Sequence, residues 1–370
     1  MQLSILAIKD KSRAFLCQLF NQVALPSFQS ASIPYIRDRS ECFVPVPFEH
    51  HLLHIPTTDD MAAPSEATQS PQWPVKTSEF QNHHSDSTRW NDFQFRPDDI
   101  VISSWGKSGT TWMQQIVSQL IFQGSEETPI NTTSPWLDLR PIPLEPVVGM
   151  LEAQKHRRFI KTHLPLENLV FSPKAKYIFV ARDGRDAFWS LHNHMYRATP
   201  LFYQLMNDTP GRVGPALLKP PADPRQYFLD ILEDDEQDSV ALPFWKTIRG
   251  WYSARDLPNL LLVHFNDLKA DLSGEIQRIA AFLDIEVPDA NLNEITEHCT
   301  FDYMKSHAAE VSPPQSDVAF ENGADTFVHK GTNGRWKDVL SADDVKLYEE
   351  KAVAELGEEC ARWLANGRKL

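Results

Sequence analysis

The sequence predicts a three-layer α/β fold, in which a parallel central sheet is flanked by helices and includes a P-loop-like, phosphate-binding strand-turn-helix. Two observations point to this class. From Ile100 onward, short apolar runs alternate with amphipathic stretches. All 14 glycines lie in the same part of the chain, the first being Gly106. Apolar runs that lack polar alternation are typical of parallel strands covered on both faces by helices.

Four apolar runs are the expected strands, and amphipathic stretches follow two of them. The strands are expected at residues 100–104, 159–163, 176–182 and 260–265. Apolar residues recur with helical spacing over residues 110–122 and 273–283, which predicts helices there. Ser341 and Asp344 form a capping-box pattern that predicts the start of a last helix through residues 345–356.

Composition limits the classes of function. The 370 residues include 36 Lys and Arg against 50 Asp and Glu, a formal net charge of -14. A nonspecific binder of nucleic acid or of an anionic membrane would carry a basic excess, so we expect neither as a partner. The four cysteines are scattered, which predicts a reducing, cytoplasmic location and no zinc site.

Two segments differ from the rest of the chain. Residues 1–85 carry prolines and polar patches without a helical or strand period, and we expect a disordered or loosely attached extension followed by one domain over residues 86–370. Residues 198–240 contain six prolines and an acidic run at 233–238. This excursion is either a solvated insertion or a lid over a substrate.

The strongest local signal is the turn after the first expected strand. The segment Gly106-Lys-Ser-Gly-Thr-Thr111 leads directly into the expected helix. Glycines admit oxyanions close to backbone N–H groups, and a helix N-terminus adds partial positive charge. Lys107 and the hydroxyls of Ser108, Thr110 and Thr111 supply further donors. The turn therefore predicts a phosphate site.

This turn is not a Walker A loop, because the position where that motif needs its first glycine is Val101. It resembles instead the 5'-phosphosulfate loop of the cytosolic, PAPS-dependent sulfotransferases, which typically reads PKSGTTW; Gly106 stands at the position of the proline. PAPS is 3'-phosphoadenosine 5'-phosphosulfate.

Four further segments resemble motifs of the same family, in order along the chain. RRFIKTHLP, at 157–165, is similar to the strand end that carries the family's catalytic histidine. KYIFVARDGRDAFWS, at 176–190, resembles its 3'-phosphate segment, and residues 264–283 and 297–305 resemble its adenine-side segments. FVHKGTNGRWKD, at 327–338, is similar to the closing RKGxxGDWK signature, with His329 in place of the arginine. The resemblance covers about residues 90–365.

The resemblance implies the roles of individual residues. His163 would be the general base, with Lys107 and Lys161 neutralising the leaving phosphate. The co-substrate PAPS would be bound by Lys107, Ser108, Gly109, Thr110, Thr111, Trp112, Arg182, Ser190, Phe265, Thr300, Phe301, His329, Lys330 and Gly331. Trp112 is equally well explained as a core residue. No metal is needed for this chemistry, and none is expected.

The implied enzyme transfers a sulfuryl group from PAPS to a hydroxyl or amine of a small acceptor, leaving adenosine 3',5'-bisphosphate (PAP). Ten tryptophans and 21 phenylalanines favour an apolar or phenolic acceptor. We expect its pocket to include Pro135, Trp136, Leu137, Trp245 and the 198–240 excursion. The alternatives are a protein that binds adenosine bisphosphate without catalysis and a P-loop-like small-molecule kinase.

Overall fold

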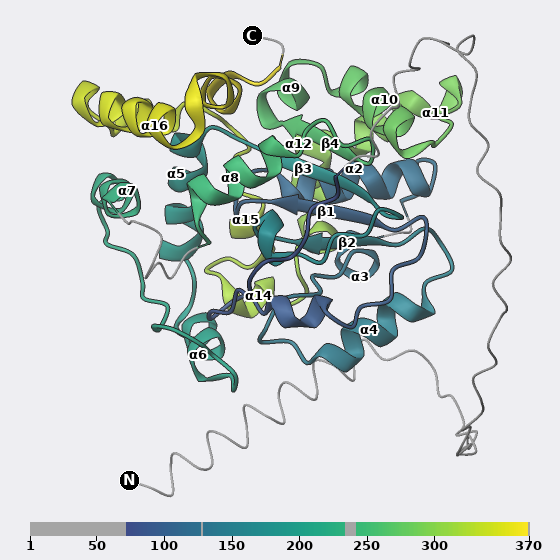
Figure 1. Cartoon of the computed structure of the whole chain (residues 1–370), viewed down its shortest axis with the longest axis horizontal. Coiled ribbons are helices and arrows are strands. Elements are labelled where there is room, and N and C mark those ends of the chain that lie inside the picture. Colours follow the sequence, from purple (N-terminus) through teal and green to yellow (C-terminus); the bar gives the residue numbers. More distant parts are fainter. Residues whose placement is uncertain (1–71, 127–128, 234–241, 369–370) are drawn as a thin grey trace, which may run out of the picture. The chain divides into compact units, whose positions relative to one another are not determined.

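The central sheet has four parallel strands in the order β2-β1-β3-β4. The computed structural model describes residues 72–126, 129–233 and 242–368. The strands are β1 (Ile100–Ser104), β2 (Phe159–Thr162), β3 (Lys176–Ala181) and β4 (Leu260–His264), which confirms the four expected strand positions (Figure 1).

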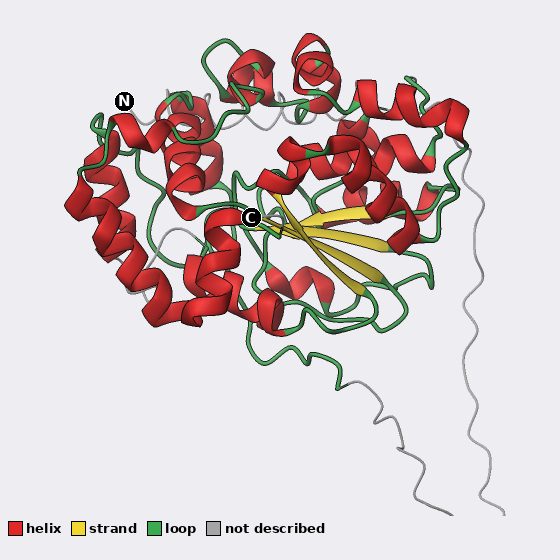
Figure 2. Ribbon diagram, turned by 90° about the horizontal axis from the view of Figure 1, so that it is seen from above, coloured by secondary structure: helices red, strands yellow, loops and turns green. Residues whose placement is uncertain are grey.

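Each face of the sheet carries its own hydrophobic core. Val101 and Phe179 point into one core, and Ile102 and Val180 point into the other. Helices α5 (Gly184–Tyr196), α8 (Phe244–Ser253) and α16 (Ala342–Asn366) contribute to the first core, whereas α2 (Thr110–Ile121), α10 (Leu272–Leu283) and α11 (Asp289–His298) contribute to the second. Figure 2 shows helices on both sides of the strands. The predicted three-layer fold is confirmed.

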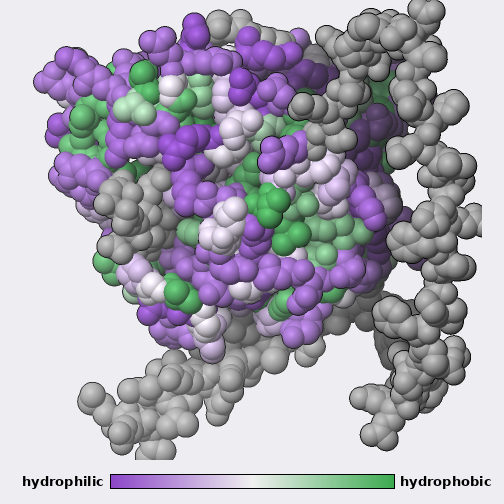
Figure 3. All heavy atoms as spheres, viewed as in Figure 1, coloured by the Kyte–Doolittle hydropathy of each residue, from purple (hydrophilic) through white to green (hydrophobic). Residues whose placement is uncertain are grey.

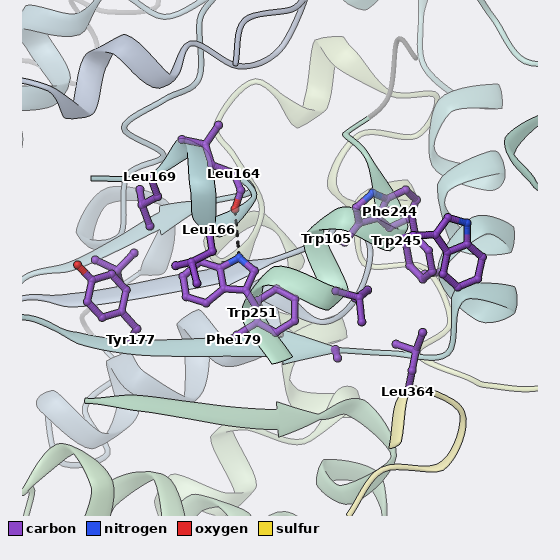
Figure 4. Close-up of a cluster of buried hydrophobic side chains, with 14 of the residues drawn as sticks. Trp105, Leu164, Leu166, Leu169, Tyr177, Phe179, Phe244, Trp245, Trp251 and Leu364 are labelled. Atoms are coloured by element: carbon purple, nitrogen blue, oxygen red, sulfur yellow. Dashed lines mark hydrogen bonds between the residues drawn. The ribbon is translucent and has the colours of Figure 1, made fainter. Parts of the chain in front are cut away.

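The first core is built on aromatic contacts, several of which are drawn in Figure 4. Trp251 of α8 stacks on Phe179 of β3, with 5.2 Å between ring centroids and 8° between ring planes. Its indole Nε1 donates a 3.2 Å hydrogen bond to the carbonyl of Leu164, just beyond β2. A tryptophan buried at this depth needs such a partner for its N–H.

The expected helices are present. Helix α2 occupies the first amphipathic stretch and α10 the second. At the start of α16, the Ser341 side chain accepts from the Asp344 amide while the Asp344 carboxylate accepts from the Ser341 amide, which confirms the capping box. Helix α16 is interrupted at Gly357, whose φ of 75° is left-handed.

The remaining elements connect these layers. They are η1 (Ser87–Trp90), α3 (Ile130–Thr133), α4 (Leu144–Ala153), η2 (Leu166–Asn168), α6 (Pro200–Asp208), α7 (Pro224–Glu233), α9 (Phe265–Ala270), α12 (Phe301–Ser306), α13 (Ala308–Val311), α14 (Ser316–Ala319), α15 (Ala324–Phe327) and η3 (Arg335–Asp338).

The structure differs from the sequence prediction at residues 72–85. Most of the predicted extension lies outside the described residues, but Asn82, His83 and Ser85 are buried. The Arg140 guanidinium holds this segment by donating to the carbonyls of Asn82 and His83. Tertiary contacts of this kind leave no periodic trace in the sequence, so the packed domain starts earlier than residue 86.

The 198–240 excursion contains two helices, α6 and α7, rather than irregular loop alone. The Arg140 guanidinium also donates to the carbonyls of Met206, Thr209 and Pro210 at the end of α6. One buried arginine therefore joins the excursion to residues 82–83. The acidic run lies outside the described residues except for Glu233.

The described helices include none that combines the length and apolar character needed to cross a membrane. On the face shown in Figure 3, hydrophilic residues cover most of the surface and hydrophobic residues form small, separate patches.

Candidate functional site

The phosphate loop connects the carboxyl end of β1 to the N-terminus of α2, as predicted. Its backbone turns through two left-handed residues, Lys107 with φ 62° and Gly109 with φ 112°. A Cβ at Gly109 would lie 3.1 Å from Cδ2 of Phe265, at the end of β4. Glycine is therefore needed here both for the backbone conformation and for the close approach of the aromatic ring.

Hydroxyl groups surround this loop, and one of them is unsatisfied. Ser108 is fully buried, and its Oγ has no hydrogen-bond partner within the part of the chain that the structure describes. Thr110 is satisfied, because its Oγ1 lies 2.5 Å from Oγ of Ser104. A buried hydroxyl without a partner costs free energy unless a ligand completes it. Ser108 at a helix N-terminus thus fits an anionic ligand.

His163 lies at the carboxyl end of β2, 7% exposed and next to this loop. Its Nδ1 is 2.7 Å from the carbonyl oxygen of Ser104. A carbonyl only accepts, so Nδ1 carries the proton and Nε2 presents a lone pair. Burial and the positive charges of Lys161 and Lys107 lower the pKa of His163 to about 3. The imidazole is therefore neutral at physiological pH, as a general base must be.

The two lysines near His163 are weakly basic for their type. Burial, together with the charges of Lys161 and Arg182, lowers the pKa of Lys107 to about 7. Burial lowers the pKa of Lys161 to about 8, although Asp138 opposes that shift. The Nζ of Lys161 lies 4.3 Å from the ring centroid of Trp136, and 4.7 Å separate the ring centroids of Trp136 and His163. Bound phosphate would restore the charged form of both amines.

Arg182, at the end of β3, connects the phosphate loop to the segment after α15. Its guanidinium donates to the Asn333 side chain at 2.7 Å, to the Thr332 carbonyl at 2.9 Å and to the Lys107 carbonyl at 3.2 Å. Asn333 also lines a pocket of about 460 Å³ with Asn266, Lys269, Ala270 and Thr332. The structure therefore brings three separate predicted segments together around one arginine.

Aromatic rings gather on the other side of Arg182. The guanidinium carbon lies 4.4 Å from the Phe265 ring centroid, and Phe265 meets Trp112 edge to face at 5.2 Å. A Cβ on Gly331 would come within 2.5 Å of the Phe301 ring, so these two predicted residues are also in close contact. The Thr300 hydroxyl caps α12 by accepting from the Tyr303 amide.

His329, at the position of the family's arginine, is not cationic. Burial and the charges of Arg335, Arg197, Lys330 and Lys107 lower its pKa to about 4. Two contacts fix segment 332–335 on α5. The Gly334 amide donates a 2.7 Å hydrogen bond to the Asp186 carboxylate, and the Arg335 guanidinium lies 5.5 Å from the ring centroid of Trp189. Ser190 follows Trp189 on the same helix. Several cations thus surround the predicted 3'-phosphate residues.

Sequence reasoning missed several side chains that contact Trp136 and Lys107, the neighbours of His163. His84 stacks on Trp136, with 6.2 Å between centroids, and lies 5.9 Å from Phe202 of α6. His194 of α5 has its Nδ1 3.5 Å from Nζ of Lys107, and its ring is 4.4 Å from that of Phe320. No local pattern marks these residues, because they come from the N-terminal segment, α5, α6 and the loop after α14.

The predicted acceptor residues divide into two groups. The Pro135 carbonyl accepts from the Lys161 amide at 2.9 Å, and Trp136 contacts His163, so both lie at the site. Leu137 and Trp245 are core residues, and Trp245 packs against Phe244 and Tyr348. Asp138, which sequence reasoning also missed, accepts from the indoles of Trp90 and Trp136 and thereby orients the latter.

Comparisons with known proteins agree with this geometry. A family model described as the sulfotransferase domain matches residues 97–357. A glycolipid sulfotransferase of Mycobacterium bovis (strain BCG / Pasteur 1173P2) is 33% identical over 310 residues, which cover 77% of this chain and 93% of that protein. Sulfotransferase 1 family member D1 of Rattus norvegicus is 27% identical over 281 residues, which cover 73% of this chain and 88% of the rat protein.

Solved structures show the same fold. Mouse sulfotransferase SULT7A1 complexed with PAP has a TM-score of 0.57 at 22% identity, covering 75% of this chain and 90% of that chain. Retinol dehydratase in a complex with retinol and PAP has a TM-score of 0.58 at 21% identity, covering 73% and 84% respectively. The family model matches most of the chain, and the ordered motifs of the sequence predicted the same family. This chain therefore belongs to the sulfotransferase family and is a transferase.

Proposed function

We propose that this sulfotransferase transfers the sulfuryl group of PAPS to a hydroxyl or amine of a small, apolar or phenolic acceptor, with His163 as the general base. The observation that carries this proposal is the hydrogen bond from His163 Nδ1 to the Ser104 carbonyl. It leaves the unprotonated Nε2 of a neutral imidazole beside the phosphate loop and two half-buried lysines.

Residues on both sides of Arg182 are suited to the nucleotide. Ser108 has an unsatisfied buried hydroxyl in the loop that would hold the 5'-phosphosulfate. Arg182 and Ser190 would bind the 3'-phosphate. The contact of Arg182 with the closing segment that contains Lys330 and Gly331 supports its part in this role. The rings of Trp112, Phe265 and Phe301 offer apolar surfaces for adenine.

The proposed reaction is an in-line displacement at sulfur. The acceptor oxygen forms a bond to sulfur as the bond from sulfur to the bridging phosphate oxygen breaks, and PAP leaves with that electron pair. His163 Nε2 takes the acceptor proton. Lys107 and Lys161 stabilise the negative charge that develops on the leaving phosphate, as preorganised cations do at a transition state.

The surroundings of His163 support an acceptor with an apolar body. The His163 ring contacts Trp136, and successive ring contacts lead from Trp136 to His84, Phe202 and Phe320. The Mycobacterium bovis relative is named a glycolipid sulfotransferase, so lipid-linked hydroxyls belong in any search for the acceptor. A cytoplasmic location stays a prediction from the scattered cysteines.

An acceptor screen with labelled PAPS tests the proposal. We expect sulfation of one or more members of a panel of phenols, aliphatic alcohols, sterols, glycolipids and amines. His163→Ala should lower kcat by at least about 100-fold and leave the Kd for PAP, measured by calorimetry, within about twofold. Binding of PAP without transfer to any acceptor would favour the non-catalytic alternative. Magnesium-dependent consumption of ATP would favour the kinase, and an unchanged kcat for His163→Ala would refute the role of the histidine.

A further inference from the structure

His84 reaches the catalytic side of the molecule from a segment in which the sequence predicted no packed structure. Its ring is nearly parallel to that of Trp136, at 18°, and Trp136 in turn contacts both His163 and the Lys161 ammonium. Trp136 thus contacts both His84 and the proposed base.

The backbone of His84 is held firmly. Its carbonyl accepts a 2.7 Å hydrogen bond from the Arg140 amide, and its own amide donates to the Asn82 side chain at 2.8 Å. The Arg140 guanidinium fixes the carbonyls of the two preceding residues. A side chain on such a backbone is preorganised, so little entropy is lost when it binds a ligand.

The imidazole of His84, in contrast, is unsatisfied. Within the described residues neither ring nitrogen has a hydrogen-bond partner. His84 is half-buried, whereas His83 beside it is 3% exposed. Burial and nearby positive charges keep the pKa of His84 well below 6.5. The neutral ring offers one N–H donor and one acceptor.

Phe202 is the second aromatic neighbour of the His84 ring, after Trp136. Its ring contacts that of His84 at 5.9 Å and that of Phe320 at 5.6 Å. An acceptor that places its reacting hydroxyl at His163 would therefore meet aromatic surface next and a polar nitrogen at the rim of that surface.

We propose that His84 is a specificity-determining residue that hydrogen-bonds a second polar group of the acceptor, remote from the hydroxyl that is sulfated. This inference rests on the proposed function. It narrows the acceptor to molecules with an apolar or aromatic body and two hydrogen-bonding groups, one at each end.

The test uses the acceptor that wild-type enzyme sulfates with the highest kcat/KM in the screen above. His84→Phe keeps an aromatic ring and removes both polar atoms, whereas His84→Gln keeps a donor and an acceptor. We expect His84→Phe to raise KM for that acceptor by about three- to tenfold, the effect of one hydrogen bond, with kcat changed less than twofold. His84→Gln should restore at least part of the loss.

A matched control is His156→Phe. His156 also contacts aromatic rings, with Phe122 at 4.9 Å, and lies before β2, at the end of the strand opposite His163. This variant should leave KM for the acceptor unchanged. The Kd for PAP should stay within twofold of wild type in all three variants, which shows that the nucleotide site is intact.

The outcomes separate this inference from the proposed function. If wild type neither binds PAP nor sulfates any acceptor, the proposed function itself fails. If wild type is active and His84→Phe leaves KM unchanged, lowers kcat alone, or weakens PAP binding as much as acceptor binding, the assignment of His84 is wrong while the proposed function stands.

Discussion

The charge states at the site follow from individual contacts. One carbonyl, that of Ser104, fixes the proton of His163 on Nδ1. Burial lowers the pKa of both Lys107 and Lys161, and the positive charges of Lys161 and Arg182 lower the pKa of Lys107 further. In the free enzyme the two lysines therefore bind their protons less tightly than lysines in water do. A bound anionic ligand would raise their pKa values again.

This arrangement predicts how PAP binding depends on pH. The pKa of Lys107 is about 7 and that of Lys161 about 8, so both amines lose their protons as the pH rises from 7 to 9. Since only the charged amines attract phosphate, the Kd for PAP should increase over this range, measured by calorimetry at constant ionic strength. Lys107→Arg stays charged and should show a shallower increase; an equal slope in both proteins would contradict the assignment.

His329 leads to a second prediction at this scale. Burial and four neighbouring cations lower its pKa to about 4, so it is neutral at pH 7. His329→Arg would add a permanent charge and a forked donor, and charge-assisted hydrogen bonds contribute about 1.5–3 kcal/mol. We expect PAP to bind about tenfold more tightly, with no gain for adenosine 5'-monophosphate, which lacks the 3'-phosphate. Tighter binding of both nucleotides would exclude a 3'-phosphate contact.

At the scale of elements, Arg140 joins parts that are distant in sequence. It is 5% exposed, and its guanidinium donates to the carbonyls of Asn82, His83, Met206, Thr209 and Pro210. Burial of an arginine is tolerated when its donors are satisfied in this way. The N-terminal segment and the end of α6 are thus fixed by the same side chain.

Replacing this arginine should destabilise the protein. Arg140→Met keeps most of the apolar stem but leaves several buried carbonyls without donors, so we expect the free energy of unfolding to fall by at least about 2 kcal/mol in urea titrations. Arg212→Met is the control. Because Arg212 is exposed, this substitution should change the free energy of unfolding by no more than about 0.5 kcal/mol. A loss of equal size in both variants would show that Arg140 has no special role.

At the scale of the whole molecule, the residues before β1 belong to the domain. Trp90 is fully buried, and its indole donates to Asp138 at 3.1 Å, the carboxylate that also holds Trp136. His84 lies on the same segment. The chain before the phosphate loop therefore contributes both to the core and to the surroundings of His163.

A comparison of two truncations tests this contribution. Relative to a chain that starts at residue 72, a chain that starts at residue 91 lacks Trp90 and His84. Loss of a buried tryptophan costs about 3–5 kcal/mol. The Tm of the chain that starts at residue 91 should therefore be at least about 5 °C below that of the longer chain in a thermal melt. Equal Tm values would mean that residues 72–90 are dispensable for folding.

The sequence by itself determined the strands, the phosphate loop and the family, because each depends on a local pattern. Continuous apolar runs mark β1 to β4, and the GKSGTT turn is contiguous. Only the tertiary structure decided the surroundings of His163. His84 reaches Trp136 across more than 50 residues of chain, and Arg140 bonds Met206 across 66. Such contacts depend on how the layers pack and on which buried polar groups need partners, and neither has a period that sequence reasoning could detect.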